Sequence, residues 1–324
     1  MNERFQLKYV SLRQPYLFAL LLMVVAALVN LVLQPNLLEL RVLNGNLRSF
    51  LPLMIVTAGQ AIVIMGSGID LSVGAMVSLV TAVLVTQMSL DASAGQILLV
   101  ILLACGVGMA AGGLNGFGVA WLRLPPIVTT YATSFIFSGL ALWILPRPGG
   151  NMPETFARWY RQATPLGIPL GIWVAAVLVL LWYLLRKTKY GSYLFAVGGK
   201  PDAAYATAVP VTRVLFSTYV IAGLMSAFAA LALTLGTSSG DPRIGAAMTL
   251  DSIVAVVLGG TRLSGGQGGV AGSILGVIIL GLIRNIISFA NVPSWYQTLV
   301  DALIILIALA GPGLVQLIRR RRVA

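Results

Sequence analysis

The sequence has no histidine, one cysteine and few charged residues, and each shortage excludes a class of function. Without histidine, the chain lacks a common proton relay and a common metal ligand. Because Cys105 is the only cysteine, no disulfide framework and no paired-cysteine metal site can form within the chain. A serine–histidine pair is also excluded, and no two carboxylates stand close in sequence. We therefore expect no enzymatic activity, no metal and no cofactor.

Charged residues make up 9% of the 324 residues, against about a quarter in an ordinary soluble domain, and 58% are hydrophobic. The sequence therefore predicts a single-domain (1–324), all-α polytopic membrane protein. Taking about 20 apolar residues as one crossing, we expect about ten transmembrane helices, the eighth short enough to be re-entrant. They lie near residues 16–33, 47–65, 71–90, 95–121, 127–145, 167–185, 214–235, 246–261, 267–288 and 295–318.

The net charge of +12 is explained by the distribution of basic residues between the loops, without a role in binding nucleic acid. Ten crossings divide the loop residues into two sets. One set has fourteen members: Arg4, Lys8, Arg13, Arg123, Arg186, Lys187, Lys189, Lys200, Arg213, Arg262 and Arg319 to Arg322. The other has six: Arg41, Arg48, Arg147, Arg158, Arg161 and Arg243. Because cytoplasmic loops are enriched in lysine and arginine, we expect both termini in the cytoplasm.

The apolar stretch QAIVIMGSGIDLSVGAMVSL, residues 60–79, contains an aspartate between glycine pairs. Gly66 and Gly68 allow the chain to leave one helix, and Asp70 can cap the next by accepting from the N–H of Ser72 or Val73. A broken helix is tolerated in a membrane where protein surrounds it or where it lines a cavity. Asp70 is thus either a cap alone or a cap that also faces a solute.

Other polar residues in the apolar segments are candidates for a solute pathway or for contacts between helices. Arg284 and Asp301 approach the same membrane face on consecutive helices, so we expect them to form an ion pair. Thr57 and Thr133 are further polar candidates. The residues expected to line or support the pathway are Gln60, Gly66, Gly68, Asp70, Ser72, Gly74, Asn115 and Asp251.

Two segments resemble each other: GIDLSVGAMVSLV in the third predicted span and TLDSIVAVVLGG in the eighth. Each begins with an apolar residue followed by aspartate, and the two would run in opposite directions across the membrane. This pattern suggests inverted repeats.

The pentapeptide LSGGQ, residues 263–267, spells the signature sequence of ABC ATPases. An ATPase of that class also needs a GxxxxGK[ST] phosphate loop, and the sequence contains none. We therefore interpret this segment as a tight glycine-rich turn between two spans.

The loop of residues 186–213 is the longest predicted cytoplasmic segment. Gly198 and Gly199 are expected to form a turn, and Pro201 suits the first position of a short helix that Asp202 stabilises and Pro210 stops. This helix either rests on the membrane surface or docks a cytoplasmic partner.

Four stretches together resemble the permease subunits of bacterial ABC importers for monosaccharides, the ribose-type permease family. They are GSGIDLSVG, LRLPPIVTTYATSFIFSGLAL, YGSYLFAVGGKPDAA and LDSIVAVVLGGTRLSGGQGG, in the order of the family's motifs from about residue 50 to 280. The sequence departs from the family pattern at Ser67 and Ala208, where glycine is usual, and at Tyr205, where arginine is frequent.

The resemblance implies a type II importer-like fold in the bacterial inner membrane and a pair of permease subunits, identical or homologous. It also implies cytoplasmic ATPase subunits and a periplasmic solute-binding protein as partners. Gly198, Gly199, Pro201, Asp202, Ala203 and Ala204 would then belong to the segment that meets the ATPase.

The function expected from these observations is translocation of a monosaccharide or related small polar solute by alternating access. The alternatives are a permease for a nucleoside, an autoinducer-like furanose or a branched-chain amino acid, or an ion-coupled transporter that acts alone.

Overall fold

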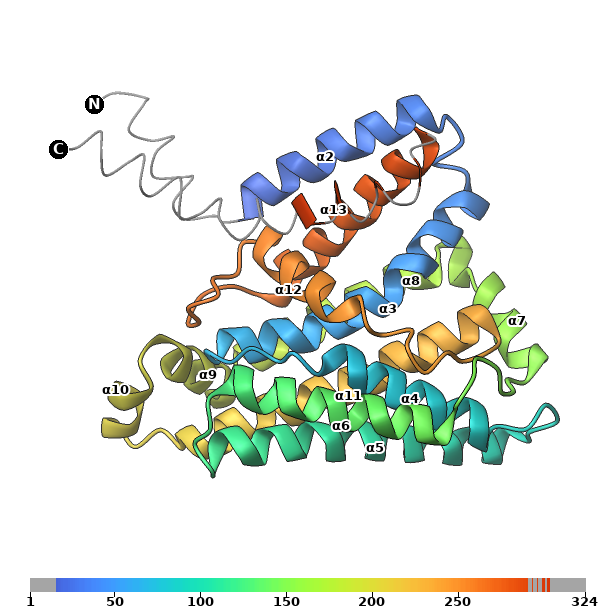
Figure 1. Cartoon of the computed structure of the whole chain (residues 1–324). Coiled ribbons are helices and arrows are strands. Elements are labelled where there is room, and N and C mark those ends of the chain that lie inside the picture. The colour runs from blue at the N-terminus through green and yellow to red at the C-terminus, as the bar shows by residue number, and fades with distance from the viewer. Residues whose placement is uncertain (1–15, 291–292, 294–295, 297–298, 301, 304–324) are drawn as a thin grey trace, which may run out of the picture.

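Figure 1 shows the computed structural model of the chain, which describes residues 16–290, 293, 296, 299–300 and 302–303. Regular structure in this part of the chain is helical, apart from one isolated β-bridge between Gly149 and Gly240. The helices are α2 (Tyr16–Leu33), α3 (Leu40–Met65), α4 (Val73–Gln87), α5 (Ala94–Ala120), α6 (Pro126–Ile144), α7 (Glu154–Gln162), the 3-10 helix η1 (Pro165–Gly167), α8 (Leu170–Arg186), α9 (Lys189–Gly199), α10 (Pro201–Ala206), α11 (Val211–Thr237), α12 (Met248–Leu258) and α13 (Val270–Phe289).

Five described helices are long and apolar enough to cross a membrane: α3, α5, α6, α11 and α13. A sixth candidate consists of α7, η1 and α8, which are bent by 77° at a break. The predicted spans 71–90 and 246–261 are the shorter helices α4 and α12, with 15 and 11 residues. The predicted span 295–318 lies mostly outside the described residues. The structure is thus that of a multi-pass helical protein, and the count of ten crossings remains a prediction.

Helix α11 lies at the centre of the fold and packs against α3, α4 and α5. Small residues allow α11 to approach α5 closely, as they commonly do in membrane helices. A Cβ added to Gly112 would lie 2.2 Å from the carbonyl oxygen of Tyr219, and one added to Gly223 would lie 2.0 Å from that of Gly108. Gly112 and Gly223 therefore serve close packing of α5 against α11.

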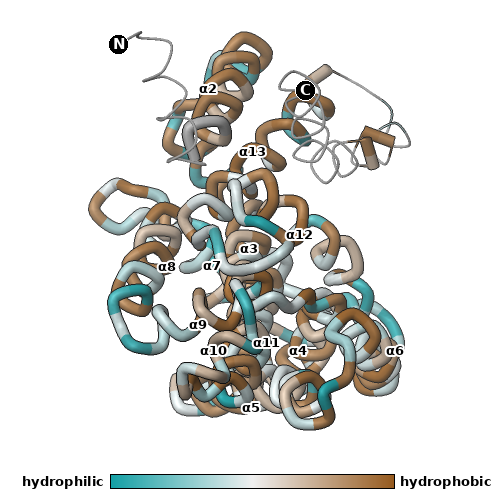
Figure 2. The backbone as a smooth tube through the Cα atoms, turned by 90° about the vertical axis from the view of Figure 1, so that its left-hand side faces the viewer, coloured by the Kyte–Doolittle hydropathy of each residue, from teal (hydrophilic) through white to brown (hydrophobic). Residues whose placement is uncertain are grey.

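The helices form layers, with α2 and α13 on one side, α4, α5 and α6 on the other, and α3 between them (Figure 1). Asn30 in α2 is fully buried, and its amide donates hydrogen bonds of 2.9 Å to the carbonyl oxygens of Ala26 and Leu282. This side chain therefore fixes α2 to α13. Figure 2 views the molecule from the end that carries α9 and α10, while α7 lies at the opposite end in Figure 1.

The chain breaks between α3 and α4 as the sequence predicts. Helix α3 ends at Met65, Gly66 caps it, and α4 begins at Val73. The left-handed backbone conformation of this break falls on Ser67, with a φ of 66°, and on neither of the flanking glycines. Gly68 instead provides room, because a Cβ there would lie 2.5 Å from the hydroxyl of Tyr219.

Candidate functional site

Asp70 lies in a buried polar cluster beside the helix break. One carboxylate oxygen of Asp70 accepts from the backbone N–H of Ser72 at 2.8 Å and from its hydroxyl at 2.7 Å. Both residues are fully buried. The first of these bonds is the predicted contact with the Ser72 N–H, but Ser72 is itself the N-cap residue of α4 and no side chain caps that helix, so Asp70 holds the segment before α4 and does not cap it. In this structure Asp70 does not face solvent.

Asn115 of α5 and Thr133 of α6 complete this cluster. The Asn115 amide donates to the Ser72 hydroxyl at 2.7 Å and to the second Asp70 oxygen at 3.4 Å, while Thr133 donates to the Asn115 carbonyl oxygen at 2.6 Å. Buried polar groups need such partners, because an unpaired one costs about 1–3 kcal/mol. The cluster therefore joins the α3–α4 break to α5 and α6.

The other polar pathway candidates are also buried. Thr57 and Gln60 in α3 are fully buried, and the Thr57 hydroxyl and both polar atoms of the Gln60 amide have no hydrogen-bond partner among the described residues. Gly74 serves close packing, because a Cβ there would lie 2.1 Å from the carbonyl oxygen of Gly245. A role of Thr57, Gln60 and Gly74 in the solute pathway remains a prediction.

Asp251 at the start of α12 forms an ion pair with Arg284 of α13, with 2.8 Å between a carboxylate oxygen and a guanidinium nitrogen. The Asp251 side chain is 13% exposed and that of Arg284 is 40% exposed. Asp301, the partner predicted for Arg284, lies outside the described residues. The sequence analysis missed the Asp251–Arg284 pair because the two residues are 33 positions apart, on helices that meet only in the fold.

The segment 186–213 contains two helices, α9 and α10, where the sequence predicts a loop with one short helix. Gly198 and Gly199 are the last residues of α9, so their prediction as a turn is wrong. The direction changes at Lys200, which has an extended backbone. Pro201 begins α10 as predicted, and Pro201, Asp202 and Ala203 are exposed whereas Ala204 is buried. Gly198 is buried and serves close packing of α9, because it lacks a side chain, whereas Gly199 is exposed and a Cβ there would meet no atom within 4 Å.

Three segments meet where α9 ends, and we name this place the three-segment junction. The Ser67 hydroxyl donates to the carbonyl oxygen of Gly198 at 2.7 Å, and the N–H of Gly266 donates to the carbonyl oxygen of Met65 at 3.0 Å. A Cβ on Gly198 would lie 1.7 Å from that same Met65 oxygen. The α3–α4 break, the end of α9 and the turn of residues 263–267 are therefore in direct backbone contact.

A further contact fixes α9 to α11. Ser217 donates to the phenol oxygen of Tyr190 at 2.8 Å. Burial raises the pKa of the Tyr190 phenol, and the hydrogen bond from Ser217 partly offsets that rise. The phenol therefore stays protonated at neutral pH, and α9 is held at both of its ends.

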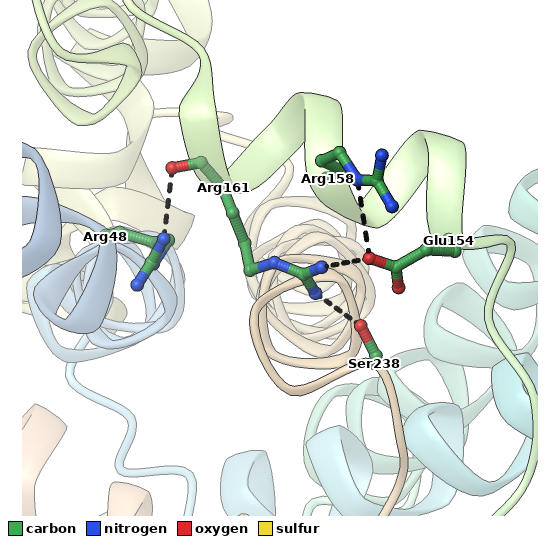
Figure 3. Close-up of polar contacts among 5 residues, drawn as sticks. All are labelled: Arg48, Glu154, Arg158, Arg161 and Ser238. Atoms are coloured by element: carbon green, nitrogen blue, oxygen red, sulfur yellow. Dashed lines mark hydrogen bonds and ion pairs between the residues drawn. The ribbon is translucent and has the colours of Figure 1, made fainter.

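The opposite end of the molecule carries a basic cavity of about 710 Å³. Its lining includes Arg41, Arg48 and Arg161. Arg48 donates to the backbone oxygen of Arg161 at 3.0 Å, and the Arg161 guanidinium contacts Glu154 at 2.7 Å as well as Ser238 (Figure 3). Arg158 lies 3.7 Å from the same Glu154 oxygen. Glu154 thus holds two arginines in place, while the cavity remains basic.

The turn formed by the LSGGQ pentapeptide connects α12 to α13, as the sequence predicts. Gly265 and Gly266 have φ values of 79° and 69°, which few other residues adopt readily. The turn belongs to the three-segment junction, a role that the sequence analysis missed because only the fold brings it beside Ser67 and Gly198.

Comparison with known proteins defines the class to which this arrangement belongs. The profile of the family described as "Branched-chain amino acid transport system / permease component" matches residues 42–309, so the chain belongs to that family. The chain is 31% identical to the ribose import permease protein of Escherichia coli K12, over 95% of both chains. It is 37% identical to that of Bacillus subtilis, over 91% of this chain and 90% of the relative. The fructose import permease protein of Rhizobium meliloti is 36% identical over 78% of this chain and 72% of its own. No solved structure matches the chain.

Proposed function

We propose that this chain is the membrane-spanning permease subunit of an ATP-driven importer for a monosaccharide or a related small polar solute. One observation carries the proposal: the chain aligns over 78–95% of its length with import permeases that are named for sugars. The multi-pass helical fold and the composition agree with it. In this proposal the chain has no catalytic activity, and a separate ATPase subunit hydrolyses ATP.

Helix α10 and the residues before it form the surface that meets the ATPase in this proposal. The segment consists of Gly198, Gly199, Pro201, Asp202, Ala203 and Ala204. Its exposed face supports the assignment, and so does the three-segment junction, in which the Ser67 hydroxyl of the α3–α4 break donates to Gly198 of α9 at 2.7 Å. Movement of α10 would therefore be transmitted to the helix break and to the polar cluster around Asp70.

The proposed location is the bacterial inner membrane, with ten crossings and both termini in the cytoplasm. Arg123 lines a cavity together with Pro201 and Asp202, while Arg41, Arg48 and Arg161 line the cavity at the other end. The two charge sets thus gather at different ends of the molecule, which supports the orientation. The antiparallel directions of α4 and α12 agree with inverted repeats (Figure 1).

In this proposal the basic cavity lies on the side of the periplasmic solute-binding protein and would attract acidic residues of that partner, because opposite charges steer association. A second permease subunit, identical or homologous, would complete the pathway through the membrane. A nucleoside, a furanose signal or a branched-chain amino acid remains the alternative cargo. An ion-coupled transporter acting alone is the alternative mechanism.

Affinity purification of the tagged protein from its native membrane, followed by identification of the copurifying proteins, tests this proposal. We expect an ABC ATPase, a permease subunit and a solute-binding protein, and we expect the binding protein to bind one member of a sugar panel. Recovery of the permease without any ATPase, from membranes in which the tagged protein supports uptake, would contradict the proposal.

A further inference from the structure

A groove of about 490 Å³ runs between α4, α6 and the segment that leads into α12. Its volume falls within the range of small-molecule sites, about 300–1,000 Å³. Along α6 the lining residues are Tyr131, Ser134, Ser138 and Leu142. Because these positions are spaced by three or four residues, they form one stripe that is roughly 16 Å long at 1.5 Å per residue. The groove therefore follows much of one helix across the membrane.

Hydroxyl groups from three elements line this groove. Ser78 of α4 accepts from the N–H of Gly245 at 3.0 Å, and Thr249 of α12 accepts from the N–H of Gly74 at 3.1 Å. Within the described chain both hydroxyls act only as acceptors, so neither hydrogen is already used; Thr249 is partly exposed, whereas Ser78 is 3% exposed at the wall of the groove. Ser134 donates to the Tyr131 backbone oxygen at 2.6 Å, which leaves its lone pairs available. The groove thus offers donors and acceptors on facing walls.

The lining also defines the charge and the shape of a ligand. Among the described lining residues Arg243 alone is charged, and it is exposed. Leu71, Ala75 and Leu142 supply apolar surface beside the hydroxyls. An ionised solute would lose water of hydration in the groove and would find no opposite charge deep inside to replace it. Such desolvation of an unpaired charge is costly. A neutral polyol with hydroxyls on its edge and C–H groups on its faces satisfies both kinds of surface.

We propose that this groove is the surface along which the solute crosses, and that Ser78, Ser134, Ser138 and Thr249 bind the hydroxyls of a neutral sugar. The inference rests on the proposed function and names the site within it. It also assigns the buried cluster around Asp70 to support of the α4 wall, since Asp70 and Asn115 are fully buried whereas Ser134 and Ser138 are partly exposed.

Cysteine labelling tests this assignment, because Cys105 can be replaced by alanine to give a cysteine-free background. The variants are Ser138→Cys, Ser134→Cys and the control Ile136→Cys. Ile136 is 52% exposed and lies two residues from both serines, so it faces away from the groove on the same helix. The probe is a charged methanethiosulfonate, which attacks thiolates in contact with water.

We expect the reagent to modify both serine-position variants, to leave Ile136→Cys unmodified, and to abolish ribose uptake by the complete transporter after modification at residue 138. Absence of labelling at both 134 and 138, or labelling that leaves ribose uptake intact, would overturn the assignment. Labelling of Ile136→Cys at the same rate as the serine-position variants would also overturn the assignment, because water would then contact both faces of α6 equally. If the cysteine-free complex takes up no sugar of the panel, the proposed function fails, whereas the labelling pattern still decides which face of α6 contacts water.

Discussion

Replacement of Gly198 by alanine perturbs the three-segment junction at one point, and Gly199 offers a matched control. A Cβ on Gly198 would lie 1.7 Å from the Met65 carbonyl oxygen, where real Cβ atoms keep at least 3.0 Å, so the backbones must separate by about 1.3 Å. Nothing lies within 4 Å of a Cβ on Gly199. Both glycines are helical, and alanine favours a helix over glycine by about 1 kcal/mol. The difference in unfolding free energy between Gly198→Ala and Gly199→Ala therefore reports the steric clash with Met65, because the gain in helix propensity is the same in both.

Overpacking of this kind costs about 1–3 kcal/mol, and the 2.7 Å hydrogen bond between Ser67 and Gly198 would contribute about 1 kcal/mol more when it breaks. We expect Gly198→Ala to lower the free energy of unfolding by ~2–4 kcal/mol relative to Gly199→Ala. We also expect fewer sugar molecules transported per ATP hydrolysed. Denaturant unfolding in detergent and paired uptake and ATPase assays measure both quantities. Equal behaviour of the two variants would refute the reasoning.

Three other predictions concern single side chains. Asp70→Asn keeps an acceptor for Ser72 and should retain uptake, whereas Asp70→Ala should lose ~1–3 kcal/mol of stability; loss of uptake in a well-folded Asp70→Asn protein would show that the charge itself is needed. Ala208 has a φ of 59°, so Ala208→Gly should raise the free energy of unfolding by ~1 kcal/mol, while Ser67→Gly should gain less because it also removes the hydroxyl. Arg284→Met should lower the free energy of unfolding by ~1–2 kcal/mol. Loss of one partner of a fully buried pair costs about 3–5 kcal/mol, and the cost is smaller here because the arginine is 40% exposed. Adding Asp251→Asn to Arg284→Met should lower the free energy of unfolding little further, because the ion pair is already lost.

Local signals in the sequence predict much of the architecture. Apolar runs locate the long helices, and Pro201 marks the start of α10. Gly66 and Asp70 indicate the α3–α4 break because their contacts are local: Gly66 caps α3, and Asp70 accepts a hydrogen bond from Ser72, two residues further on. The family pattern adds a further signal, since Ser67 and Ala208 stand where glycine is usual and both have positive φ values.

Contacts between segments that lie far apart in the chain could not be predicted from the sequence. Gly198 and Gly199 are typical of a turn in the sequence, yet both lie in a helix, and the close approach of Met65 requires a residue without a side chain at Gly198 alone. The Asp251–Arg284 pair depends on how α12 lies against α13. The sequence does not indicate the polar stripe on α6 either. Ser134 and Ser138 line a groove only because the fold places Thr249 of α12 opposite them.

The most direct test of the account is uptake, into vesicles that contain this permease with its copurifying subunits, of the sugar that the copurified solute-binding protein binds. We predict that uptake requires the ATPase, ATP inside the compartment that holds the ATPase, and the solute-binding protein on the opposite side. We further predict that dissipating ion gradients leaves it unchanged. Uptake driven by a proton or sodium gradient through the permease alone, without ATP or binding protein, would contradict the account.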